Sequence, residues 1–136
     1  MDEDEAAVAG LRLAAEQRWI ECARELVGAG TLLGDQEFAA RQGWGDQALN
    51  QALAADRVFF VDCQGVRLFP AFYADPQYKR QQLEEVSRTL GALPGGSKWQ
   101  FFTCPKGSLG GCTPLEALVR GGFRAVNMAA EAFATR

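Results

Sequence analysis

Apolar residues recur every three or four positions near the start of the chain, with charged side chains mostly between them. The apolar set is Val8, Leu11, Ala15, Trp19, Cys22 and Leu26. This spacing matches the 3.6-residue turn of a helix and gives the helix one apolar face. Gly28 and Gly30 favour its end. Residues 1–30 are therefore predicted to form an N-terminal amphipathic helix.

Two short helices are predicted next, on either side of a sharp turn at Gly43-Trp44-Gly45. Asp35 and Asp46 stand where N-cap residues are expected, one at the start of each helix. The apolar positions are Phe38, Ala39 and Ala40 in the first helix and Ala48, Leu49, Ala52 and Leu53 in the second. Two short helices joined by a three-residue turn are typical of a helix-turn-helix.

A β-hairpin is predicted directly after these helices. Val58–Val61 and Val66–Phe69 are rich in residues that favour strands, and Asp62–Gly65 is a turn sequence between them. A hairpin in this position forms a wing beside the two helices. Residues 31–74 are thus predicted to form a winged helix-turn-helix.

Residues 75–96 are predicted to form a connecting helix and a break. We expect the helix to begin near Asp75-Pro76. Its apolar positions are Tyr78, Leu83, Val86 and Leu90. The glycines and the proline of Gly91–Gly96 then end it. The remaining residues, 97–136, are expected to form a helical C-terminal lobe.

The C-terminal lobe carries the strongest local signal in the chain. Gly110-Gly111 indicates a tight turn, Thr113 and Glu116 have the spacing of a capping box, and Pro114 suits the first turn of the helix they start. Gly121 indicates where that helix ends. A final helix carries Phe123, Val126, Ala130 and Phe133. The predicted fold class is mostly α with a small β-hairpin: a winged helix-turn-helix followed by a small helical C-terminal lobe.

Composition narrows the chemistry that the chain can perform. The 136 residues suffice for one compact domain or for two small lobes with a shared core. The chain contains no histidine, which removes Ser-His, Cys-His and His-metal arrangements. The four cysteines lack Cys-x-x-Cys spacing and are read as reduced thiols: Cys22, Cys63, Cys104 and Cys112. We predict no catalytic residue, metal or cofactor, and keep a small thiol enzyme using Cys104 or Cys112 as a lesser alternative.

Charge is unevenly distributed along the chain. The net charge is −3, but Asp2-Glu3-Asp4-Glu5 lies at one end, and without it 13 acidic residues face 14 basic ones. From Ser97 onward five basic residues face two acidic ones. The acidic start is unlike a secretory signal, and no run approaches the roughly 20 apolar residues that span a bilayer. We expect a cytoplasmic protein that does not enter the membrane.

Two segments resemble known families. Phe38–Trp44, followed by a short helix and then by Leu68–Phe72, resembles the winged helix-turn-helix of MerR-type and excisionase proteins. Leu109–Leu118 resembles the toxin-binding domain of the Xre/MbcA/ParS antitoxin family. The resemblance implies that the N-terminal part binds operator DNA and that the C-terminal part inserts into a partner toxin of the NAD-consuming RES type. It implies a non-catalytic regulator or antitoxin-like protein that forms a homodimer.

Three features depart from the family pattern. Cys112 stands where such proteins often carry Arg, and Gly45 stands where Ser or Thr commonly caps the reading helix and touches a phosphate. The reading helix, Asp46–Gln51, has no Lys or Arg. These departures favour a second hypothesis, in which the protein is an interaction module whose winged part no longer binds DNA.

The candidate binding residues fall into three groups. Side-chain amides that could read base edges are Gln47, Asn50 and Gln51. Arginines that could contact phosphates are Arg41, Arg57 and Arg67. Residues that the resemblance places against a partner protein are Leu109, Gly110, Gly111, Thr113, Arg120, Arg124 and Arg136. An exposed polar helix face and solvated surface charge are the alternatives for the first two groups.

Overall fold

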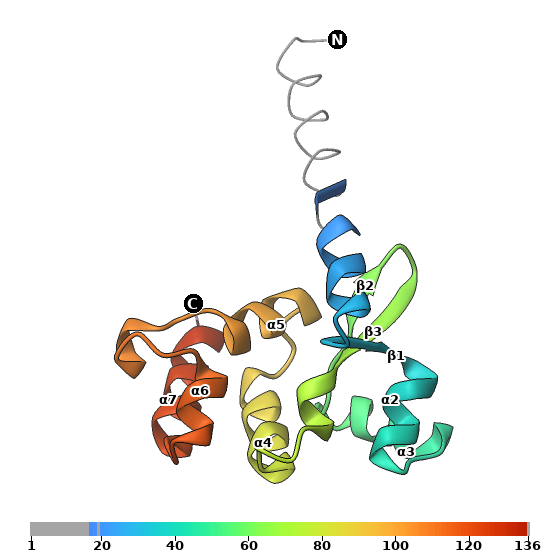
Figure 1. Ribbon diagram of the computed structural model, residues 1–136. Helices are drawn as coiled ribbons and strands as arrows, with labels where there is room; N and C mark the ends of the chain where they lie inside the picture. The colour runs from blue at the N-terminus through green and yellow to red at the C-terminus, as the bar shows by residue number, and fades with distance from the viewer. Residues whose placement is uncertain (1–16, 19, 136) are drawn as a thin grey trace, which may run out of the picture.

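A computed structural model describes residues 17–18 and 20–135 (Figure 1). Residues 20–28 are helical, and the first part of the chain continues through β1 (Leu32–Gly34), α2 (Asp35–Gln42), α3 (Asp46–Ala54), β2 (Val61–Cys63) and β3 (Val66–Pro70). The second part consists of η1 (Ala71–Ala74), α4 (Arg80–Leu90), α5 (Gly95–Thr103), η2 (Gly107–Leu109), α6 (Pro114–Val119) and α7 (Phe123–Ala134). The fold is mostly α with a small antiparallel sheet. Most of the predicted apolar stripe of the first helix, from Val8 to Trp19, lies outside the described residues.

The winged helix-turn-helix, here called the winged segment (31–74), has the predicted helices and hairpin. Gly43 ends α2 in the left-handed conformation, with φ 73°. The hairpin turns at Gln64 and Gly65, which have φ values of 52° and 80°, and the Asp62 carboxylate accepts a hydrogen bond of 2.9 Å from the backbone N–H of Gly65. Positive φ at both turn residues suits the twist of a two-residue hairpin.

Three details of the winged segment differ from the prediction. The sheet has a third strand, since β1 pairs with β3, giving the order β1-β3-β2. Strand β2 starts at Val61, so that Val58 and Phe59 are buried in the core without strand pairing. Gly34 and Gly45 occupy the N-cap positions of α2 and α3, and Asp35 and Asp46 are the first helical residues. Carboxylates there still favour the helix start through its dipole.

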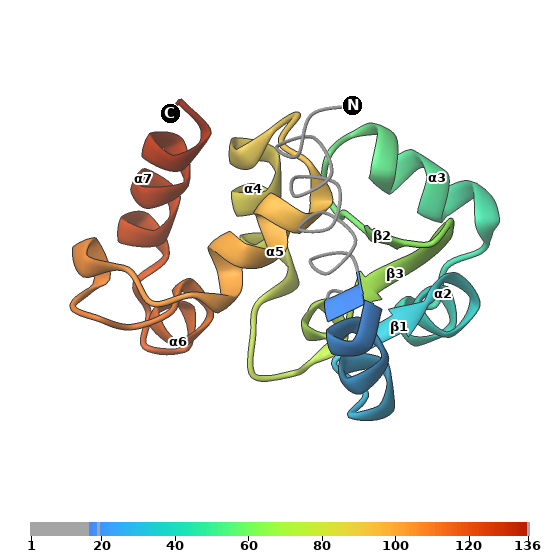
Figure 2. The same cartoon turned by 90° about the horizontal axis from the view of Figure 1, so that it is seen from above.

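Aromatic rings connect the winged segment to the C-terminal lobe (97–136). Phe59 and Phe102 are stacked with ring centroids 5.9 Å apart, and Phe72 and Trp99 are stacked at 6.0 Å. Figure 2 shows α5, which carries Phe102 and Trp99, between the hairpin and α7. The two lobes therefore share one hydrophobic core.

The helix of the connecting region is shorter than predicted. Helix α4 begins at Arg80, because Asp75 forms a turn in which its carboxylate accepts a 3.0 Å hydrogen bond from the backbone N–H of Gln77. Helix α7 packs along α4 and buries Val126 and Ala130. The connecting helix is thus part of the body of the molecule.

The local signals of the C-terminal lobe are confirmed. Thr113 accepts a hydrogen bond of 3.1 Å from the backbone N–H of Glu116, and Glu116 accepts one of 3.1 Å from the backbone N–H of Thr113. This is the predicted capping box, with Pro114 in the first turn. Gly121 follows α6 in the left-handed conformation, with φ 83°.

Candidate interaction surfaces

The three candidate base-reading amides lie on one exposed face of α3. Gln47, Asn50 and Gln51 are all exposed, at spacings of three and four residues, whereas Leu49 and Ala52 are buried beneath them. Helical spacing places such residues side by side. The structure therefore brings together the amides that the sequence singled out.

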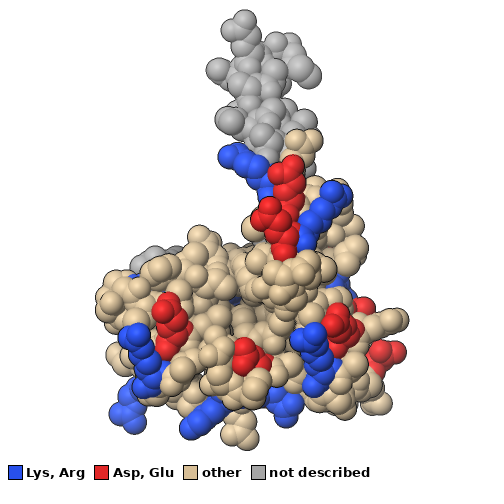
Figure 3. Space-filling model, in the orientation of Figure 1, with Lys and Arg blue, Asp and Glu red and all other residues tan. Residues whose placement is uncertain are grey.

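Two carboxylates, those of Asp35 and Asp46, lie beside that face. A surface pocket of about 330 Å³ beside α3 is lined by Asp35, Gln36, Asp46, Leu49, Asn50 and Arg67. The winged segment contains five Asp and Glu residues and three Arg residues. In the space-filling view, acidic and basic side chains stand next to one another over α2 and α3 (Figure 3). This surface lacks the positive excess that attracts a phosphate backbone.

Two of the candidate phosphate-binding arginines are paired with carboxylates. Arg41 lies 3.0 Å from Glu37 on the same helix. Arg67 lies 3.3 Å from Asp35, and its guanidinium also sits 5.5 Å from the ring centroid of Phe60. Ion pairs at this exposure contribute little to stability, so either arginine could exchange its partner for another anion at a small cost.

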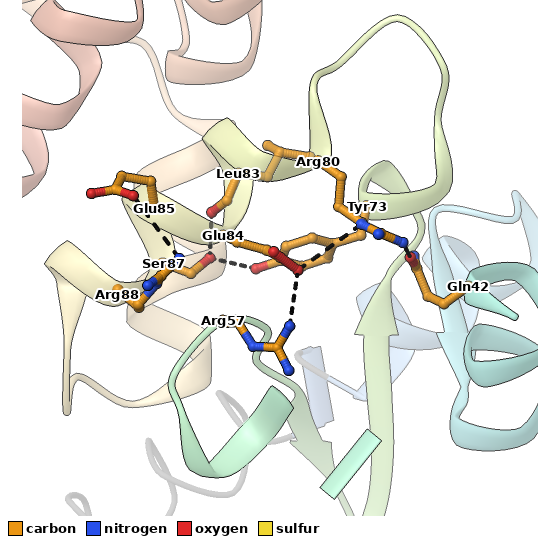
Figure 4. Close-up of polar contacts among 9 residues, drawn as sticks. All are labelled: Gln42, Arg57, Tyr73, Arg80, Leu83, Glu84, Glu85, Ser87 and Arg88. Carbon is orange, nitrogen blue, oxygen red and sulfur yellow. Dashed lines mark hydrogen bonds and ion pairs between the residues drawn. The ribbon is translucent and has the colours of Figure 1, made fainter. Parts of the chain in front are cut away.

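The third arginine, Arg57, belongs to a network between α3 and α4 (Figure 4). Its Nη1 lies 3.7 Å from Oε1 of Glu84, a buried carboxylate on α4, and Nε of Arg80 lies 4.0 Å from the same oxygen. Both guanidinium groups also lie over the ring of Trp44, at 5.9 Å and 5.6 Å from its centroid. Arg57 thus connects the winged segment to α4.

Three further polar side chains lie in this region: Gln42, Tyr73 and Ser87 (Figure 4). Arg80 donates a 3.2 Å hydrogen bond to Oε1 of Gln42, whose Nε2 is buried without a hydrogen-bond partner among the described residues. Tyr73 and Ser87 hydrogen-bond to each other, and Ser87 Oγ also donates to the carbonyl oxygen of Leu83 at 2.8 Å. Burial raises the pKa of Tyr73 well above its usual value, so its hydroxyl stays protonated. These groups hold α4 in place.

The predicted partner-binding loop is a compact turn. Gly110 and Gly111 are exposed with φ values of 66° and 84°, and the backbone N–H of Gly111 donates to the carbonyl oxygen of Lys106 at 3.0 Å. Leu109 is partly buried against the core. Only glycine adopts such a conformation at two successive positions without strain.

Apolar and basic side chains are exposed at the end of α6 and along α7. We call these residues the α6–α7 surface: Val119, Arg120, Arg124 and Met128. Val119 is 50% exposed and Met128 is 65% exposed. Arg120 donates a 3.3 Å hydrogen bond to the sulfur of Cys112. The hydrogen bonds of Thr113 lower the pKa of Glu116, and the charge of Arg120 adds a smaller effect in the same direction. Basic side chains are also visible along this edge in Figure 3.

Arg120 and Arg124 of this surface were identified from the sequence, but Val119 and Met128 were not. Arg124 and Met128 are four residues apart and lie on one exposed face of α7. Arg124 forms no ion pair with any residue that the structure describes. The remaining candidate, Arg136, lies outside the described residues. The signal that could have shown Met128 is the helical spacing of the apolar residues Val126, Ala130 and Phe133, which leaves Met128 on the opposite face of α7.

Comparison with models of known families, with curated protein sequences and with solved structures finds no significant match for this chain. Over residues 17–18 and 20–135, no helix has the length and apolar character needed to cross a membrane. The same residues contain no cluster of three or more cysteine, aspartate or glutamate side chains placed to hold a metal ion. The four cysteines are free thiols.

Proposed function

We propose that this chain is a non-catalytic, antitoxin-like binding protein whose α6–α7 surface contacts a partner protein. The observation that carries the proposal is a contrast between the two lobes. Arginines of the winged segment are paired with carboxylates, whereas Arg124 has no such pair among the described residues and stands beside exposed Met128. An unpaired cation next to an apolar side chain can be covered favourably by an acidic partner.

The composition of the surface supports a protein partner. Met and Arg are enriched at protein interfaces, and Arg is enriched among the residues that dominate binding energy. The capped start of α6 and the glycine turn before it fix the position of the surface relative to the core. A partner toxin, as the resemblance of Leu109–Leu118 implies, is the partner class that we propose.

Co-expression of the full chain with the product of the adjacent gene tests the proposal. Arg124→Glu and Met128→Asp each reverse one property of the α6–α7 surface, and we expect either to weaken the complex on the order of tenfold. Arg41→Glu, an exposed position on α2, is the matched control and should leave the affinity unchanged. Equal affinity for all four proteins, or no complex with the wild type, would exclude this function.

Operator binding is the second candidate, and the shared exposed face of Gln47, Asn50 and Gln51 favours it. Amide side chains can pair with adenine in the major groove. A gel-shift titration of the chain on its own promoter DNA, repeated at several salt concentrations, tests it. A specific complex that weakens with salt and is lost in Asn50→Ala would establish DNA binding, and its absence would leave the winged segment as a scaffold.

A further inference from the structure

A cavity of about 770 Å³ lies where the winged segment meets α5. The end of α3 and the residues leading into β2 form one wall, and the Pro/Gly break with α5 forms the other. Most of the lining is apolar, including Leu53, Val58, Phe59, Leu93 and Trp99. Volume and lining are those of a site for a small organic molecule.

One buried cation lines this cavity. Lys98 is only 4% exposed, and its ammonium has no hydrogen bond or ion pair with any residue in the described part of the chain. The nitrogen lies 6.0 Å from the ring centroid of Phe59. Burial lowers the pKa of Lys98, and the opposing effect of the Asp56 carboxylate is smaller. The ammonium of this buried side chain has no ion pair within the residues that the structure describes, so an anion in the cavity would stabilise it.

The start of α5 adds a second positive group to the same lining. Gly95 and Gly96 line the cavity at the first turn of α5, and this nine-residue helix has no side-chain cap. The first N–H groups of a helix have no acceptor within it and carry partial positive charge. The helix start and Lys98 are therefore two independent features that suit an anion.

Two carboxylates limit how much negative charge the cavity accepts. Asp56 and Asp62 also belong to the lining, on the wall opposite α5. A ligand with several negative charges would be repelled by them. A single anionic group at Lys98 would be repelled less, even though the Asp56 carboxylate is near enough to Lys98 to affect its pKa. The aromatic rings of Phe59 and Trp99 leave the remaining space suited to an apolar body.

We propose that this cavity binds a small amphiphilic monoanion, with its anionic group at Lys98 and the start of α5 and its apolar body against Phe59 and Trp99. The ligand would contact both the winged segment and α5. This site does not depend on the partner binding proposed above, because the α6–α7 surface contributes no residue to it.

The test uses two fluorescent probes with similar aromatic bodies: anilinonaphthalene sulfonate, which carries one negative charge, and neutral phenylnaphthylamine. Each is titrated into the full chain, into Lys98→Met and into Lys106→Met, a control lysine outside the cavity. We expect Lys98→Met to weaken sulfonate binding on the order of tenfold while binding of the neutral probe stays the same. Lys106→Met should behave as the wild type.

Amide chemical shifts locate the probe. Saturating sulfonate should shift the signals of Phe59, Gly95 and Lys98 and leave those of α7 in place. An amide spectrum of Lys98→Met that is as well dispersed as that of the wild type shows that the variant is folded. Wild-type sulfonate affinity in Lys98→Met, shifts elsewhere, or no sulfonate binding to the wild type would each overturn the proposal. Inorganic pyrophosphate, with several charges and no apolar body, should not compete.

Discussion

Contacts between individual side chains determine which of the site residues predicted from the sequence are available to a ligand. Arg57 was predicted as a phosphate contact, and in the structure it lies 3.7 Å from Glu84, which is 27 positions further along the chain. Sequence spacing carries no information about such a pair, because it exists only after α4 has packed against the winged segment. Gln47, Asn50 and Gln51 were predictable, since helical spacing alone places them together.

Replacing Lys98 by Met should stabilise the protein near neutral pH, because the variant removes a charge that burial disfavours. Burial lowers the folded-state pKa of Lys98, so the charged form is disfavoured in the folded protein. The penalty is fully present below the folded-state pKa and disappears as pH rises above the unfolded value. Met keeps the apolar stem and removes the charge. Urea denaturation of both proteins measures the difference, and a loss of stability in the variant would contradict this account.

Replacing Glu84 by Gln should destabilise the protein by about 1–3 kcal/mol. The variant leaves the guanidinium groups of Arg57 and Arg80 without the buried carboxylate that they share. Glu85→Gln is the matched control, because Glu85 is exposed and lies 3.9 Å from Arg88, and it should change stability by less than about 0.5 kcal/mol. Similar unfolding midpoints for the two variants in urea would rule out a structural role for the Glu84 network.

Helices and strands were predicted correctly where the signal lies within a few neighbouring residues. The capping box of α6 involves Thr113 and Glu116, three residues apart, and it was predicted correctly. Strand β1 has only three residues, too few for a period, and exists because Leu33 lies opposite Phe69 across the sheet. The start of α4 was placed too early because the turn at Asp75 replaces its expected first turn.

Loss of the Thr113 cap should cost about 1 kcal/mol. Thr113→Ala removes the hydroxyl that accepts a hydrogen bond from the backbone N–H of Glu116, whereas Thr113→Ser retains it. Thermal unfolding followed by circular dichroism compares the three proteins. We expect the Ser variant to match the wild type and the Ala variant to melt at a lower temperature; equal melting of both variants would show that the cap contributes nothing.

The whole molecule is organised around the aromatic contacts between its two lobes. Phe59 from the winged segment and Phe102 from α5 are both buried and stacked. The sequence allowed either one compact domain or two lobes with a shared core, and it could not show which rings meet across the Pro/Gly break. Because the core is continuous, neither lobe has a complete apolar interior by itself.

Unfolding should therefore be a single cooperative transition. Amide signals from β3 and from α7 should disappear at the same urea concentration, although these elements belong to different lobes. Phe102→Leu should lower that concentration for both elements together, with a loss of about 1–3 kcal/mol. Separate transitions for β3 and α7 would mean that the lobes unfold independently.

The close approach at Gly95 has a consequence for how the two lobes are held. A Cβ atom at this position would lie 1.8 Å from the carbonyl oxygen of Phe60, so even one methyl group cannot be accommodated. Any larger residue would force α5 away from the backbone of Phe60 and Val61. Spacing between the halves is thus set by the absence of a side chain, and Gly95→Ala offers a way to widen the junction without changing a single charge.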